Sequence, residues 1–257
     1  MYALKLPYTR KGFDLPQRYS LEDFATNKLS LWGWIWQHCD LSLAQRILEV
    51  GCGTGDFWLH NINRLPRTLR ITCTDISKFV LDKFAIRLGL NRQFSLQTMN
   101  VKHLLFAVNQ FDIIFAHNIL HLLDEPLQAL LNLNQALKSQ GQFFALVPTT
   151  NTHRKLYQLA NEIYSSSIFA KLYEFDSIES VLSKEFVIAG KYQYQNEYHI
   201  REAAVVVDHI YFMSMQQGIH LPKAFFQAYE DRIKQLIEKQ GKLIVNGDAN
   251  LYLCRSR

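Results

Sequence analysis

Long apolar runs are missing from this chain of 257 residues. No stretch approaches the ~20 apolar residues that a bilayer-spanning helix needs, so we expect no membrane span. The opening residues, MYALKLPYTRKGF, also lack the apolar stretch of roughly 7–15 residues that marks a cleaved secretory signal. We therefore predict a soluble, cytoplasmic protein.

Glycine, proline and cysteine are all scarce. With 11 Gly and 6 Pro the chain cannot be collagen-like or dominated by linkers. Its four cysteines show no C-x-x-C spacing, which disfavours a zinc site or a redox pair and predicts reduced structural thiols; they are Cys39, Cys52, Cys73 and Cys254. With 48% hydrophobic and 20% charged residues, the composition predicts one large globular domain, or one domain with a small elaboration.

Clustered basic charge is absent as well. The net charge is +5, from 28 Lys and Arg against 23 Asp and Glu, but no four basic residues are consecutive. The densest group, Arg64, Arg67 and Arg70, is interrupted by Pro66 and fits a solvated surface. We expect no nucleic-acid partner, because such a partner needs its cations gathered on one face. The oligomeric state is not indicated.

Residues 45–150 alternate short β-like runs with helical patterns, which predicts a parallel sheet covered by helices on both faces. The expected strands are Arg46–Val50, Leu69–Thr74, Phe94–Met99, Phe111–Ala116 and Gln142–Val147. The expected helices are Phe57–Asn63, Lys78–Leu88 and Pro126–Lys138, with a turn near Lys102–Phe106 and Gly141 just past a helix end.

The flanking segments have other patterns. In residues 1–44, the run Leu29–Trp36 is apolar all round and predicts a helix covered on most sides, either packed at the sheet edge or roofing a ligand pocket. After Pro148 the chain is helical and aromatic through Tyr173, and Asp176 with Glu179 resembles a capping box. The remaining expected elements are a strand Phe186–Tyr194, helices Arg201–Gln217 and Lys223–Lys239, and a final strand Lys242–Cys254 interrupted by a bulge or bend at Asn246–Gly247.

A glycine-rich turn follows the first expected strand. Gly51, Gly53 and Gly55 alternate with other residues in ILEVGCGTGDF. Glycine permits positive φ and lets the backbone approach a ligand at the carboxyl end of a strand. The spacing differs from the G-x-G-x-x-G of dinucleotide sites, and no G-K-[ST] follows, so a nucleoside triphosphate is disfavoured.

Asp75 ends the second expected strand, twenty residues after Gly55. A carboxylate at this place can accept hydrogen bonds from both hydroxyls of an adenosine ribose. An aspartate after a strand is more often a helix N-cap, but the glycine turn upstream favours the ribose role.

The segments ILEVGCGTG, TDIS and FDIIFAHNILHLLDEP together resemble the motifs of class I methyltransferases that use S-adenosylmethionine, over roughly residues 45–150. RYSLEDFATNKLSLWGW, GCGTGDFWLHNINRLP and VPTTNTHRKLYQL are similar to a bacterial branch that acts on small molecules. The resemblance implies an α/β, Rossmann-like, doubly wound, mostly parallel seven-stranded sheet with an antiparallel final strand and helical lid elements. It implies an N-terminal helical cap (1–44), a cofactor-binding core (45–150), and substrate-covering helices with strands that complete the sheet (151–257).

The same resemblance implies cofactor contacts. Glu49 and the three glycines would face the methionine end, Asp75 the ribose and Ile76 the adenine. Asn100, with the Val101 amide beside it, stands where the family commonly has an Asp; Asn can accept the adenine amino hydrogen bond without charge. The branch often has Asn-His where this chain has His117-Asn118, which places the role of His117 in doubt. Tyr19 and His117 complete the expected cofactor contacts. Tyr19 and the tryptophans Trp32, Trp34 and Trp36 either close over the methionine moiety or an apolar substrate, or pack in the core.

Methyl transfer from a sulfonium is an in-line displacement, for which a protein mainly supplies alignment. A general base is needed only for a protonated acceptor, and histidine suits that role near neutral pH. His117 and His121 flank the end of the fourth expected strand, and their four-residue spacing would set them on one face of a helix. His153 follows the fifth expected strand. For each histidine, a role in packing or helix capping is the alternative. No convincing ligand set for a metal surrounds them.

The sequence therefore predicts an enzyme that methylates a small, partly apolar metabolite on oxygen, nitrogen or carbon, in a pocket built from the aromatic residues after Tyr157. The alternatives are a nucleic-acid or protein methyltransferase, a cofactor-binding partner or sensor without turnover, and a dehydrogenase of related fold.

Overall fold

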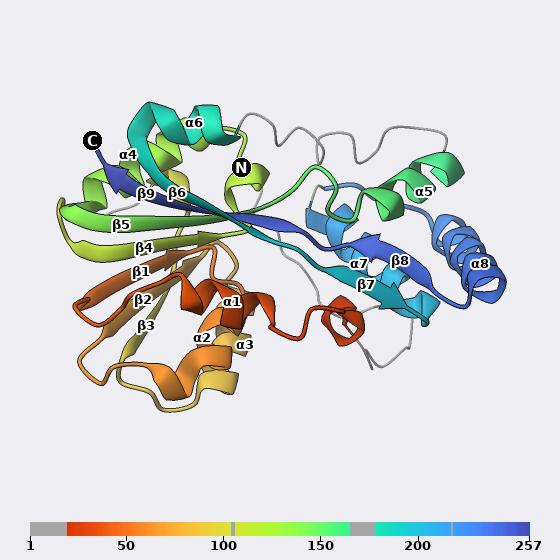
Figure 1. The fold of residues 1–257 in the computed structure, drawn as a ribbon, viewed down its shortest axis with the longest axis horizontal. Helices are drawn as coiled ribbons and strands as arrows, with labels where there is room; N and C mark the ends of the chain where they lie inside the picture. Colours follow the sequence, from red (N-terminus) through yellow and green to blue (C-terminus); the bar gives the residue numbers. More distant parts are fainter. Residues whose placement is uncertain (1–19, 104–105, 165–177, 217) are drawn as a thin grey trace.

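The computed structural model describes residues 20–103, 106–164, 178–216 and 218–257. Its centre is a seven-stranded sheet in the order β3-β2-β1-β4-β5-β9-β6 (Figure 1). The strands are β1 (Arg46–Val50), β2 (Arg70–Asp75), β3 (Phe94–Thr98), β4 (Phe111–His117), β5 (Leu137–Pro148), β6 (Phe186–Tyr194) and β9 (Ala249–Ser256). The first five are parallel, and β9 runs antiparallel between β5 and β6, so the predicted fold class is confirmed.

The two faces of the sheet are both buried, because the apolar residues of its central strands alternate between two cores. In β5, Phe143 and Ala145 join the core on one face, whereas Phe144 and Leu146 join the core on the other. This period of two is what a strand covered on both sides requires.

Helices cover these faces. Helices α1 (Leu31–Gln37), α2 (Asp56–Asn61) and α3 (Lys78–Leu88) pack on one face, and α4 (Pro126–Ala136) and α6 (Ile178–Glu185) on the other (Figure 1). Three short 3₁₀ helices, η2 (Ile62–Arg64), η3 (Val101–His103) and η4 (Leu120–Leu122), follow α2, β3 and β4.

A long twisted ribbon leaves this sheet and carries a second group of elements. Strand β7 (Glu197–Ile200) continues β6, β8 (Leu243–Asn246) precedes β9, and the two pair antiparallel in a separate two-stranded sheet. Helices α5 (Arg154–Tyr164), α7 (Ala203–Gln216) and α8 (Lys223–Gln240) surround it, beside η1 (Leu21–Phe24) (Figure 1). We call residues 149–164 and 195–248 the cap; its apolar side chains form a third core.

Some predicted boundaries were wrong. Helix α4 ends at Ala136 and β5 begins at Leu137, so Gly141 lies inside a strand, next to a register shift against β4. The expected final strand Lys242–Cys254 is two strands in two sheets, because β8 pairs with β7 and β9 with β5 and β6. The capping box at Asp176 lies outside the described residues.

None of the helices in the described ranges combines the length and the apolar character that crossing a membrane requires.

Candidate functional site

The glycine turn connects β1 to α2, and its three glycines are needed for different reasons. All three have positive φ, at 66°, 55° and 75°. A Cβ on Gly51 would lie 2.3 Å from the side chain of Ile119, and one on Gly55 would lie 2.1 Å from the ring of Phe84. A Cβ on Gly53 would meet no atom within 4 Å. Gly53 therefore borders open space, where a ligand can approach the backbone.

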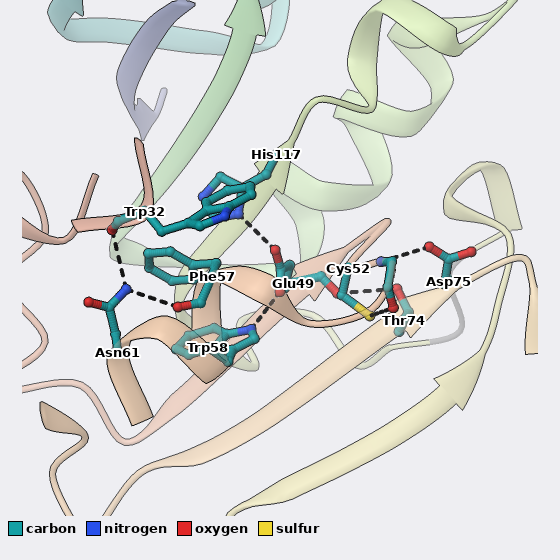
Figure 2. A network of polar contacts seen from close by, with 10 residues as sticks. Trp32, Glu49, Cys52, Phe57, Trp58, Asn61, Thr74, Asp75 and His117 are labelled. Carbon is teal, nitrogen blue, oxygen red and sulfur yellow. Dashed lines mark hydrogen bonds and ion pairs between the residues drawn. The ribbon is translucent and has the colours of Figure 1, made fainter. Parts of the chain in front are cut away.

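Asp75 is the last residue of β2 and adjoins this opening. Its Oδ2 accepts the Gly53 N–H at 3.0 Å (Figure 2), and its Oδ1 accepts the Ser77 N–H at 2.9 Å. Burial raises the pKa of the Asp75 carboxyl, while the Ser77 and Gly53 amides act in the opposite direction. Each carboxylate oxygen has a second lone pair, so the group can accept further hydrogen bonds from a diol.

The neighbouring strand ends offer an apolar side chain and an amide. Ile76 is 58% exposed directly after Asp75. Asn100 follows β3, and its Oδ1 accepts the Lys102 N–H at 2.9 Å; the Val101 side chain is buried. Because β3, β2 and β1 are parallel neighbours, these groups lie at one edge of the sheet, and they fit an adenosyl group.

Glu49, in β1, holds a buried polar network. Its Oε2 accepts the indole N–H of Trp58 at 2.5 Å, and its Oε1 lies 2.7 Å from Nδ1 of His117 (Figure 2). Glu49 is 2% and His117 6% exposed. A carboxylate accepts, so Nδ1–H of His117 donates. The sequence did not predict this network; a contact of Glu49 or His117 with the cofactor stays a prediction.

His117 and His121 do not share a helical face, contrary to our expectation. His117 ends β4, Asn118 adopts a positive φ of 54°, and His121 lies in η4. The left-handed residue turns the chain between them. The His117 ring packs against Phe57, with ring centroids 4.8 Å apart, rather than lining the cavity described below.

The tryptophans of α1 pack in the core on the α1–α3 face. Trp32 packs edge-on against the His117 ring, with ring centroids 5.8 Å apart. The ring centroids of Trp34 and Tyr194 are 5.4 Å apart, and those of Trp36 and Phe57 are 6.2 Å apart. These contacts favour the packing alternative. Tyr19 lies outside the described residues.

A cavity of about 250 Å³ lies between the core and the cap. Asn118, His121 and Leu122 follow β4, and Pro148 ends β5, so the core side is the carboxyl edge of the sheet. The side chains from the cap are mostly aromatic or polar: Thr152, His153, Tyr157, Tyr198, His209, Phe212, Met213 and Asp248. The N-terminal part of the chain contributes Glu22, from η1, and Leu31, from the start of α1.

His153 and His209 meet in the wall of this cavity. Their ring centroids are 4.3 Å apart, and Nε2 of His209 lies 3.2 Å from the hydroxyl oxygen of Tyr157. Burial lowers the pKa of His153 to about 4 and that of His121 to about 4. Burial and the neighbouring His153 hold the pKa of His209 well below its usual range. All three imidazoles are therefore neutral near pH 7.

His209, Glu22 and Asp248 were missed by the sequence analysis. His209 is the one histidine in the apolar run AAVVVDHIYFM of α7, a pattern that could have singled it out. Glu22 lies in η1, and Asp248 lies between β8 and β9. These segments meet only in the folded chain, so no local sequence pattern identifies either residue. No cluster of three or more His, Cys, Asp or Glu suited to a metal occurs in the parts of the chain that the structure describes.

The strand order and the antiparallel β9 define the chain as a Rossmann-like α/β protein of class I methyltransferase architecture. Residues 48–143 match a family described as a methyltransferase domain. This match supports the predicted class I methyltransferase family for this part of the chain, and with it S-adenosylmethionine as the cofactor.

Individual curated relatives match this chain at low sequence identity and over less than half of its length. A malonyl-[acyl-carrier protein] O-methyltransferase from Paenibacillus is 27% identical over 123 residues. The match covers 46% of this chain and 44% of that protein, so the chain spans less than half the length of this curated relative.

Solved structures share the fold. Phosphoethanolamine N-methyltransferase 2 from Haemonchus contortus, in complex with S-adenosylhomocysteine, has a TM-score of 0.55 at 14% identity, over 86% of this chain and 51% of that one. The [4+2]-cyclase SpnF has a TM-score of 0.58 at 17% identity, over 95% of this chain and 86% of that one. The fold alone thus does not determine the reaction.

Proposed function

We propose that the protein transfers the methyl group of S-adenosylmethionine to a small, partly apolar molecule bound in the cavity between core and cap. The position of that cavity carries the proposal. It lies at the carboxyl ends of β4 and β5, and β4 is the neighbour of β1, which leads into the open turn at Gly53. Ligands of doubly wound sheets bind at this edge.

The turn and the adjacent strand ends would hold the cofactor. We assign the Gly53 backbone to a close approach, Asp75 to the ribose hydroxyls, Ile76 to the adenine face and Asn100 to the adenine edge. When bound, S-adenosylmethionine supplies an electrophilic methyl group on a sulfonium.

The cap residues would orient the acceptor and exclude water. Alignment of two bound reactants contributes several kcal/mol to a displacement of this kind, and a water-poor site favours the dispersal of the sulfonium charge. His121 and His153 line the cavity as neutral imidazoles, so each is a candidate to accept a proton from the acceptor. His117 would act on the core side by orienting the Glu49 carboxylate, to which its Nδ1–H donates.

Two measurements test this function. In a thermal-unfolding assay, S-adenosylmethionine and S-adenosylhomocysteine are expected to raise the melting temperature and NAD to leave it unchanged, since only a ligand of the folded state stabilises it. Incubation of a metabolite extract with methyl-labelled donor is then expected to label a small molecule. Label in protein or nucleic acid would contradict the substrate class, and stabilisation without any label would indicate a binding protein.

A further inference from the structure

The charged groups around the cavity are of one sign. Among the described residues that line it, Glu22 and Asp248 are carboxylates, and neither lysine nor arginine occurs. Its three histidines add no positive charge near neutral pH, because burial keeps their imidazoles deprotonated. The part of the wall that the described residues form is therefore neutral to negative.

Each of the two carboxylates is fixed by one oxygen. The Tyr198 hydroxyl donates to Oε1 of Glu22 at 2.7 Å, and the Asn196 N–H donates to Oδ1 of Asp248 at 2.9 Å. Within the described part of the chain, the second oxygen of each carboxylate receives no hydrogen bond. Both groups are thus oriented and keep capacity to accept from a ligand.

The remaining wall is mostly apolar and aromatic, with Tyr157, Phe212, Met213, Leu122 and Pro148 among its residues, and it also holds the uncharged polar side chains of Asn118 and Thr152. A carboxylate placed against this wall would lose its hydration without gaining a cation. An ammonium group would instead find two oriented carboxylates, and the aromatic rings suit a cation as well as an apolar body.

We propose that the cavity selects methyl acceptors that carry no negative charge, in particular small amines with an apolar body, and that Glu22 and Asp248 determine this preference. The inference rests on the proposed function, since it names the acceptor class of the same site. An acidic acceptor, such as a malonyl group ending in a free carboxylate, is excluded by the same charges.

Three ligands that differ only in their polar end test the proposal. Binding of 2-phenylethylamine, 2-phenylethanol and phenylacetate to the full chain is measured by calorimetry at pH 7.5, with and without S-adenosylhomocysteine. We expect the amine to bind at least 10-fold more tightly than the acid, with the alcohol between them. Equal or tighter binding of the acid, or no binding of the amine, would overturn the proposal.

Charge-removing variants locate the effect. Asp248→Asn and Glu22→Gln keep the hydrogen-bond-accepting oxygen and remove the charge, so the amine should bind about 5-fold or more weakly to each while the alcohol is unchanged. Asp82→Asn, on the exposed face of α3, is the matched control and should change neither. Loss of amine and alcohol binding to the same extent would contradict a charge-based preference.

The outcomes separate the inference from the function it rests on. If S-adenosylhomocysteine fails to bind, the proposed function fails, and the ligand series without cofactor still reports on the cavity. If the cofactor binds and the acid is preferred, only the charge preference fails.

Discussion

At the scale of single residues, the glycine turn combines packing constraints with an opening. Gly51 and Gly55 exclude a Cβ because Ile119 and Phe84 already occupy that space, whereas Gly53 excludes nothing of the protein itself. A side chain at Gly53 would therefore cost only the strain of its left-handed backbone, roughly 1–2 kcal/mol, but it would project into the space assigned to the cofactor.

Gly53→Val is accordingly expected to abolish binding of S-adenosylhomocysteine, measured by calorimetry, with a small fall in melting temperature. Gly241→Val is the matched control, since Gly241 also has a positive φ, of 75°, in the left-handed region, and open space around it, at the end of α8. It should lower the melting temperature similarly and leave binding intact. Retained binding in Gly53→Val would remove the turn from the cofactor site.

Asp75 can be tested against an aspartate at the opposite edge of the sheet that also binds two backbone amides. Asp75→Ala should weaken S-adenosylhomocysteine binding by about 1–3 kcal/mol, roughly 5- to 150-fold, because buried hydrogen bonds to the ribose are lost. Asp112 also accepts two backbone N–H groups, those of Gln45 and Arg46. Asp112→Ala should lower stability without changing affinity; unchanged affinity in Asp75→Ala would refute the ribose assignment.

At this scale the sequence located the glycines and Asp75, because each follows a buried strand at a spacing set by local geometry. It could not predict that Glu49 binds Trp58 and His117, since that network depends on the packing of β1 against α2 and β4. Nor could the sequence predict that His209, in α7, lies beside His153, which directly precedes α5, because these two parts of the cap meet only in the folded chain.

At the scale of elements, the ribbon anchors the N-terminal segment, and the buried Asn196 contributes two of the hydrogen bonds. Asn196 is 4% exposed, and its Oδ1 accepts the N–H groups of Thr26 and Asn27 at 3.2 and 3.0 Å. These bonds dock residues that precede α1 onto the junction of β6 and β7.

Asn196→Ala should lower the free energy of unfolding by about 1 kcal/mol, because the Asn27 N–H loses its acceptor, whereas the Thr26 N–H keeps the Glu197 carbonyl 2.9 Å away. Hydrogen exchange of the Asn27 amide is expected to accelerate. Asn134→Ala, which removes a similar pair of hydrogen bonds to Glu185 and Ser256, should destabilise without that local acceleration. Equal exchange at Asn27 in both variants would argue against the anchor.

Strands β1 to β4 were predicted to within one residue at each end, since runs such as Ile47–Val50 are apolar and bounded by turn residues, whereas β5 begins at Leu137, before the predicted Gln142. The chain from Lys242 onward was predicted as one interrupted strand, because the local sequence indicates extended backbone but not the sheet that it joins. Only the register, with Tyr198 opposite Val245 and Leu253 opposite Phe144, assigns β8 to the cap and β9 to the core.

At the scale of the whole molecule, the neutral histidines make stability depend on pH. The folded-state pKa values of His121 and His153, about 4, lie below the value near 6.5 expected in the unfolded chain. Their contribution is therefore fully present above about pH 6.5 and is lost as the pH falls toward 4, because the unfolded chain binds the protons first.

His153→Asn removes one of these groups and retains a residue that tolerates positive φ. Between pH 7.5 and 5.0, the free energy of unfolding from urea titrations should fall less in the variant than in the parent, by on the order of 1 kcal/mol. The opposite shift at Asp75 is common to both proteins and cancels in this difference. Identical acid slopes would show that folding does not lower the pKa of His153.

The pairing of Tyr194 with Ala249 has a consequence for how this protein could diversify. Residues 195–248 leave and re-enter the core at two paired backbone positions, so a change in their length does not disturb the register of the central sheet. Because Glu22 and residues 149–164 complete the same cavity, an exchange of acceptor preference between relatives would have to move all three segments together.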